Sequence, residues 1–212
     1  MRPTVGLFLL AALSVASTPL EATSQVTAQT HVAHVMSAFP GAPNGAALLG
    51  VAEADAAVAV EHARLAGSDR TDTGPMVRHA RHVLHALGAS TIASGPGSGF
   101  GVGPAANAIA QHIELAAQAE GASEPVRQHA VHVATAARAV SARAAAMREV
   151  ANRIVATSDY VAAYDLVRQL QRLAGQLVSG ADSSGDGSIA LAEGGLEHVR
   201  THMGLMTSSG PR

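Results

Sequence analysis

Two stretches of the chain, fifty residues apart, carry the same pattern of three histidines. The members are His62, His79 and His82 in the first stretch and His112, His129 and His132 in the second. Some neighbouring positions match as well, among them Pro75 with Pro125. Most other positions differ between the stretches, so the matching imidazoles favour a chemical role. Imidazole is a common ligand of transition metals, and metal coordination is the leading interpretation.

The other possible ligands narrow the choice of metal. The chain has no cysteine, which excludes disulfides and thiolate metal sites and leaves imidazole, carboxylate and thioether groups. Such ligands suit copper, zinc, iron or nickel. Met36, Met76 and Met203 lie near histidines in the sequence and would suit copper as soft ligands, although methionine is also a common core residue. Carboxylates beside the histidines are Glu61, Glu114 and Glu197.

The composition predicts an all-α fold. Alanine is abundant, aromatic residues make up 2% of the chain, and long stretches lack both glycine and proline. Helices are expected over about residues 26–39, 46–66, 73–87, 104–119, 124–156 and 159–178. The repeat, residues 54–87 and 104–137, then consists of two antiparallel helical hairpins that pack into a bundle.

Hairpin geometry predicts which histidines meet. In a hairpin whose turn is centred near residues 70 and 71, His62 and His79 lie equally far from the turn and at the same level. The same arithmetic pairs His112 with His129 in the second hairpin. Two hairpins around a pseudo-twofold axis would then direct six imidazoles inward or along one seam. Secondary candidates for metal ligands are His31, His34, His85, His198 and His202.

Structural histidines are the alternative interpretation of these patterns. Imidazole is amphipathic and can lie at a helix interface with its nitrogens bonded to backbone or water. That interpretation is favoured for any isolated pair. It is disfavoured for the repeated trio, because three positions agree. His85 aligns with Thr135 and has no such support.

A glycine-rich segment, Gly95 to Gly103, separates the two hairpins. Such loops can bind phosphate at the start of a helix, but no strand precedes this one and the chain has no lysine. The segment also falls at the junction between the repeats. It is therefore interpreted as a linker.

The segment 182–193 carries oxygen side chains at the spacing of a calcium loop. Asp182, Ser184 and Asp186 occupy positions one, three and five, Gly187 occupies position six and Glu193 position twelve. Helical patterns flank the segment, which resembles an EF-hand loop. The resemblance implies that Ca²⁺ is bound by the side chains of Asp182, Ser184, Asp186 and Glu193 and the carbonyl of Ser188. It covers these twelve residues and their flanking helices alone.

The first sixteen residues read as a cleavable secretory signal peptide. Arg2 precedes an apolar run from Val5 to Val15, and Ser14 and Ala16 provide a small-x-small cleavage pattern. The expected location is therefore the periplasm or the exterior. The run is too short to cross a bilayer, so no stable membrane insertion is expected. A formal net charge of -2 and scattered arginines argue against nucleic acid as a partner.

The sequence thus predicts five regions. They are a signal peptide (1–16), a flexible leader (17–25), a histidine-rich bundle (26–156), an EF-hand-like helix-loop-helix (157–207) and a disordered tail (208–212). The expected function is binding of calcium and of a transition metal for buffering, carriage or sensing, with metal ions as the partners. The alternatives are a small metalloenzyme such as an oxidoreductase, or a calcium-dependent interaction module whose histidines are structural or ligate haem. An enzyme is the less favoured of these, since no catalytic triad or cysteine nucleophile is present.

Overall fold

The computed structural model describes residues 26–88 and 92–208, and within them the all-α prediction is confirmed. The predicted signal peptide, the whole of the predicted leader and residues 209–212 of the predicted C-terminal tail lie outside the described residues. The described elements are α1 (Ala28–Met36), η1 (Pro43–Gly45), α2 (Leu48–Ala66), α3 (Thr73–Ala86), α4 (Val102–Gln118), α5 (Glu124–Ala156), α6 (Tyr160–Ser179), η2 (Leu191–Glu193) and α7 (Leu196–Ser208).

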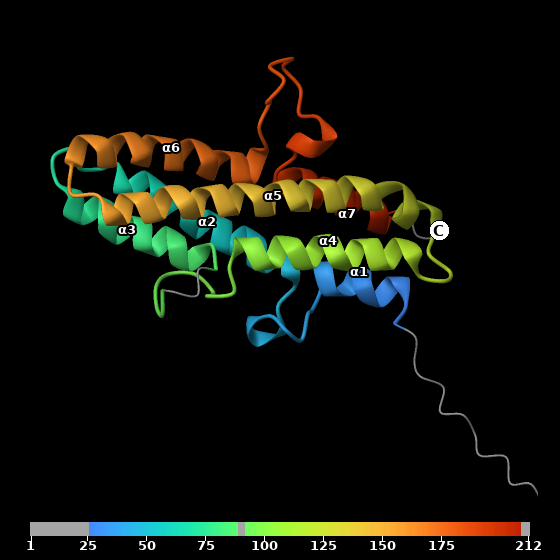
Figure 1. Cartoon of the computed structure of the whole chain (residues 1–212). Helices are drawn as coiled ribbons and strands as arrows, with labels where there is room; N and C mark the ends of the chain where they lie inside the picture. The colour runs from blue at the N-terminus through green and yellow to red at the C-terminus, as the bar shows by residue number, and fades with distance from the viewer. Residues whose placement is uncertain (1–25, 89–91, 209–212) are drawn as a thin grey trace, which may run out of the picture.

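The longest helix, α5, organises the bundle (Figure 1). Its 33 residues span about 50 Å at the rise of an α-helix. Helices α3 and α6 pack along one half of α5, α7 packs along the other half, and α4 runs beside it. Helix α1 lies against α4, and α2 packs against α3, α4 and α6. Within the described residues, α2 therefore packs against α3 and α4 packs against α5.

Small side chains allow these helices to pack closely. The buried face of α2 includes Ala52, Ala59 and Ala63, all with no exposed surface, and α5 buries alanines in the same way. Larger residues such as Ile109 and Ile113 of α4 fill the space between them. An alanine-rich sequence with few aromatic residues can therefore form a continuous core. No helix among the described residues is both long and apolar enough to span a membrane.

A buried carboxylate fixes the glycine-rich connection between α3 and α4. Asp55 of α2 is fully buried, and its oxygens accept hydrogen bonds from the Ser98 amide (2.6 Å), the Ser98 hydroxyl (2.5 Å) and the Gly101 amide (2.9 Å). Gly101 has φ +91°, and a Cβ there would lie 2.2 Å from the Gly88 nitrogen. The loop amides that could have bound phosphate thus bind a side chain of the protein itself.

An arginine ties the 182–193 loop to the bundle. The half-buried Arg143 of α5 donates to the carbonyls of Glu193 and Gly194, each over 2.6 Å. Burial lowers the pKa of Arg143, and the nearby Glu193 opposes that shift. The loop itself extends away from the helices at the top of Figure 1. Its last residues therefore lie against α5, whereas its tip faces solvent.

Candidate metal centres

The first histidine group, here the α2–α3 cluster, consists of His62, His79 and His82. The Nδ1 atom of His62 lies 2.9 Å from Nδ1 of His79 and 3.3 Å from Nδ1 of His82. The predicted pairing of His62 with His79 is confirmed. All three side chains are half-buried at the helix interface. Their ligand atoms lie within 4.8 Å of one another, as a single metal ion requires.

The α1–α4 cluster consists of His31, His34 and His112. His31 and His112 bring their Nδ1 atoms to 2.9 Å, and the rings of His34 and His112 meet edge to face with centroids 4.7 Å apart. The ring of Phe39 packs against both His34 and His112, with its centroid 5.4 Å from that of His34 and 5.3 Å from that of His112. An aromatic side chain thus covers one side of this cluster.

The α5–α7 cluster consists of His132, His198 and His202, with His129 adjacent. The rings of His132 and His202 stack with centroids 4.3 Å apart, and His198 lies 4.6 Å from His202. His129 brings its Nδ1 atom to 3.0 Å from Nδ1 of His202. This cluster therefore offers four imidazoles, of which three have ligand atoms within 4.8 Å of one another.

All three clusters share one arrangement. One helix supplies two histidines spaced three or four residues apart, and a second helix supplies the remaining ligand. The paired residues are His79 and His82 on α3, His31 and His34 on α1, and His198 and His202 on α7. Spacings of three and four place two side chains on the same face of a helix. Ten of the eleven histidines belong to these clusters or, like His129, border one.

The geometry of the α2–α3 cluster also suits a bound metal ion. A neutral ring nitrogen carries either one proton or one lone pair, so Nδ1 of His62 can form one good hydrogen bond, not two. Two nitrogens bound to one zinc ion lie about 3.3 Å apart at a tetrahedral angle and about 2.9 Å apart at a right angle. The observed separations of 2.9 and 3.3 Å match these values.

Unsatisfied nitrogens in the other two clusters also suit a cation. The Nδ1 atom of His34 and the Nε2 atom of His198 are buried and have no hydrogen-bond partner among the described residues. A buried polar atom without a partner is costly unless a ligand binds it. Each of these clusters therefore has an imidazole that could accept a metal ion.

The electrostatic environment favours neutral imidazoles. Burial, together with the neighbouring His132, His198 and His129, lowers the pKa of His202 to about 4. Burial is also the main cause of a lowered pKa at His62, His79, His82, His31, His112 and His198. A neutral imidazole has the free lone pair that a metal needs, whereas a protonated one does not.

The same shifts predict that the metal-free protein loses stability in acid. A histidine whose pKa is lower in the folded state binds more protons when unfolded, so its contribution to stability is complete above pH 6.5 and declines below it. The decline for His202 extends to about pH 4. Urea unfolding in EDTA at pH 7.5, 5.5 and 4.5 should show this loss. A variant with His62→Gln, His112→Gln and His202→Gln should lose less free energy of unfolding between pH 7.5 and pH 4.5 than the unchanged protein. Equal losses in the two proteins would show that the histidines do not cause the acid sensitivity.

The structure corrects the expected pairing in the second hairpin. His112 lies with His31 and His34 of α1, and His129 and His132 lie with α7, so His112 does not pair with His129. The six imidazoles also do not share one seam. Distance from a turn fixes the level of a residue along its helix but not the direction in which the helix turns that residue. His112 points toward α1, where it lies with His31 and His34, and His132 points toward α7, where it lies with His198 and His202.

The remaining candidate residues take other roles. His85 brings its Nδ1 atom to 3.0 Å from the Pro96 carbonyl oxygen and contacts the glycine-rich loop rather than a cluster. Met76 and Met203 are fully buried in the core, which agrees with a packing role. Glu61 and Glu114 form ion pairs with Arg64 and Arg138. No carboxylate joins the groups with converging ligand atoms in the described part of the chain.

The carboxylates of the 182–193 segment bind backbone amides of the same loop. Asp182 accepts from the amides of Gly185 (2.6 Å) and Gly187 (2.8 Å). Glu193, which is 9% exposed, accepts from Ser183 and Ser184 through one oxygen and from Ala190 through the other. The amide of Gly187 is the main cause of the lowered pKa of Asp182. Helix α7 begins only at Leu196, after Gly194 and Gly195, rather than inside the loop.

The contacts of Asp55 and Arg143 were missed from the sequence, and only that of Asp55 had a signal. Asp55 lies in the apolar stripe that runs through Leu48, Ala52 and Ala59, and an acid at such a position indicates a buried polar contact. Spacing alone already identified the secondary candidates His31, His34, His198 and His202, but it did not show that each pair lies with a histidine of the repeat. The role of Arg143 had no signal in the sequence.

Comparisons with known proteins give no relative: no family model, no curated protein and no solved structure matches the chain. The function is therefore inferred from the residues and their geometry alone.

Proposed function

We propose that this protein binds transition-metal ions at its three histidine clusters and buffers, carries or senses them. The observation that supports this most directly is the convergence of His79 and His82 on one nitrogen of His62, at 2.9 and 3.3 Å. Neutral imidazole ligands without thiolate suit zinc, copper, nickel or iron. The half-buried histidines leave room for exchange with solvent, which suits reversible binding.

Metal stoichiometry tests the proposal. Untagged protein should bind three equivalents of Zn²⁺ per chain, measured by elemental analysis after removal of free ion. His62, His112 and His202 each contact the other members of their clusters. Replacing any one of them with glutamine should therefore remove one equivalent, and the triple variant should bind none.

His85→Gln is the matched control, because His85 is half-buried like the others but belongs to no cluster. It should leave the stoichiometry at three. Metal content that is unaffected by the triple substitution would refute the proposal. Circular dichroism of each variant verifies that the helices remain folded.

We also propose that residues 182–193 bind Ca²⁺. The support is the spacing of oxygen side chains and Gly187 in the sequence, together with the tip of the loop being exposed. The carboxylates would exchange amide hydrogen bonds for the cation. A single loop with serine at position three should bind with a dissociation constant of about 10⁻⁴ to 10⁻³ M, as extracellular calcium modules do.

Isothermal titration with CaCl₂ tests this site. Glu193→Gln removes one carboxylate charge and should weaken binding at least about tenfold, since the bidentate glutamate supplies two oxygens. Glu197→Gln, at an exposed position of α7, should leave binding unchanged. Because Glu193 also holds loop amides, Asp186→Asn at the exposed tip serves as a second variant with the same expected direction. Equal affinity in all four proteins would exclude the loop as the site.

A further inference from the structure

We infer that the α2–α3 cluster binds its metal ion together with a small oxyanion, a carboxylate or a phosphate, held in an arginine-lined groove beside His82. This inference rests on the proposed metal binding and names the class of a second ligand. Three features carry it: the position of the groove, its uncompensated charge and the number of ligands that the cluster supplies.

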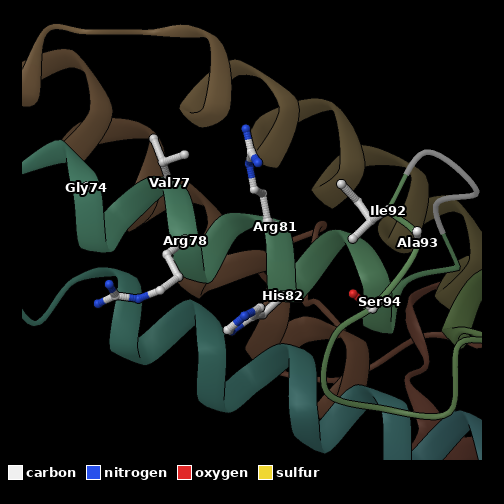
Figure 2. Close-up of a pocket in the computed structure, with 8 residues that line it drawn as sticks. All are labelled: Gly74, Val77, Arg78, Arg81, His82, Ile92, Ala93 and Ser94. Atoms are coloured by element: carbon white, nitrogen blue, oxygen red, sulfur yellow. The ribbon is translucent and has the colours of Figure 1, made fainter.

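The groove lies along the outer face of α3 (Figure 2). Its volume is about 470 Å³, and residues 92–94 also line it. Figure 2 shows His82 beside the groove, with Arg78 and Arg81 extending from α3 in different directions. Since His82 belongs to the α2–α3 cluster, the groove adjoins the candidate metal centre directly.

The two arginines of the groove carry uncompensated positive charge. Arg64, Arg127, Arg138 and Arg200 each form an ion pair with a glutamate. Arg78 and Arg81, by contrast, form no ion pair or hydrogen bond with any residue from 26–88 or 92–208. The planar guanidinium group matches the oxygens of a carboxylate or a phosphate in geometry and in charge.

The cluster also needs an anion for its own charge balance. Three neutral imidazoles leave a divalent ion with its full double charge and with at least one free coordination position. The positive charge of Arg78 disfavours positive charge at His79 and His82, and it would therefore repel a cation bound there. An oxyanion that contacts both the metal and a guanidinium group would offset this repulsion.

The groove beside the α1–α4 cluster provides an internal comparison. It borders His34 and is lined by Thr27, Gln29, Thr30, Ala33, Ala38, Pro40 and Gly45, without an arginine. Its surface is mainly apolar. The oxyanion should therefore affect metal binding at the α2–α3 cluster and not at the α1–α4 cluster.

Cobalt(II) titration followed by visible absorption tests the inference. The protein carries His112→Gln and His202→Gln so that only the α2–α3 cluster remains. Titrations are run in perchlorate, acetate or inorganic phosphate at constant ionic strength, with correction for cobalt binding by the buffer anion. Acetate or phosphate should tighten cobalt binding about tenfold, the effect of one charge-assisted contact in a half-exposed site. A response to acetate alone identifies a carboxylate site, and a response to phosphate alone a phosphate site.

Substitution of the two arginines should change the result in two opposite directions. In the protein with Arg78→Gln and Arg81→Gln added, cobalt alone should bind more tightly because two repelling charges are gone, whereas the anion effect should disappear. Arg153→Gln with Arg168→Gln, an equal change of net charge at two exposed positions outside the groove, should preserve the anion effect.

The outcomes separate this inference from the proposed function. Cobalt binding with no anion effect, or with an effect that survives loss of Arg78 and Arg81, overturns the oxyanion site and leaves metal binding intact. An absence of cobalt binding at the α2–α3 cluster overturns both. A protein with His62→Gln and His202→Gln, which keeps only the α1–α4 cluster, should show no anion effect, and an equal effect there also overturns the inference.

Discussion

Zn²⁺ at a hundred times its dissociation constant should raise the free energy of unfolding by about 8 kcal/mol. Each site occupied to that degree contributes about 2.7 kcal/mol, provided that the unfolded chain does not bind the ion. The structure supports that condition, because two of the clusters join residues far apart in the sequence, such as His31 with His112 and His132 with His198. Unfolding separates these residues and destroys the sites.

Urea unfolding with and without Zn²⁺ measures this effect, and excess EDTA should reverse it. His62→Gln should lower the gain to about two thirds, since two of three sites remain. His85→Gln should leave it unchanged. A zinc-independent free energy of unfolding would show that the imidazoles are structural.

Asp55→Ala should destabilise the protein by about 3 kcal/mol, without any effect on metal stoichiometry. The substitution leaves the buried Gly101 amide without its acceptor and removes two bonds to Ser98. For a chain of this size the melting temperature should fall by about 6 to 12 °C. Asp55→Asn should have a smaller effect, because an amide retains one accepting oxygen.

Thermal unfolding followed by circular dichroism measures the loss. Asp165→Ala is the control, since Asp165 is an exposed acid on α6. An Asp55→Ala protein as stable as the control would mean that the glycine-rich loop does not depend on this carboxylate. Because Asp55 lies in none of the clusters, metal analysis of the same variant should still give three equivalents.

The helices were predictable because their signals are local. The predicted helix over residues 124–156 has the bounds of α5, and most others differ by one to three residues. Capping shows the limit of such signals: the predicted helix 73–87 and α3 both begin at Thr73, but the range does not show that Asp72 is the N-cap and accepts a hydrogen bond from the Gly74 amide over 2.8 Å. The residues of a short segment decide whether a helix forms, whereas its first residue depends on which of several neighbouring side chains caps it.

Contacts between histidines of different helices were predictable only where a single short turn joins the two helices. His62 and His79 meet because a short hairpin holds them at one level. His112 instead meets His31, a contact across 81 residues that depends on how α1 docks and how α4 is rotated. Spacing on a single helix gave the correct pairs of ligands, but the partner helix of each pair follows from tertiary packing. The duplication within 54–137 did not determine it, and the duplication itself stays a prediction.

Anomalous X-ray diffraction from crystals grown with Zn²⁺, at wavelengths on both sides of the zinc edge, would show whether the histidine clusters bind metal. Three peaks are expected, one within each histidine cluster and about 2.0 to 2.1 Å from its ring nitrogens. Peaks absent from all three clusters, in crystals that contain zinc elsewhere, would contradict the proposed metal binding.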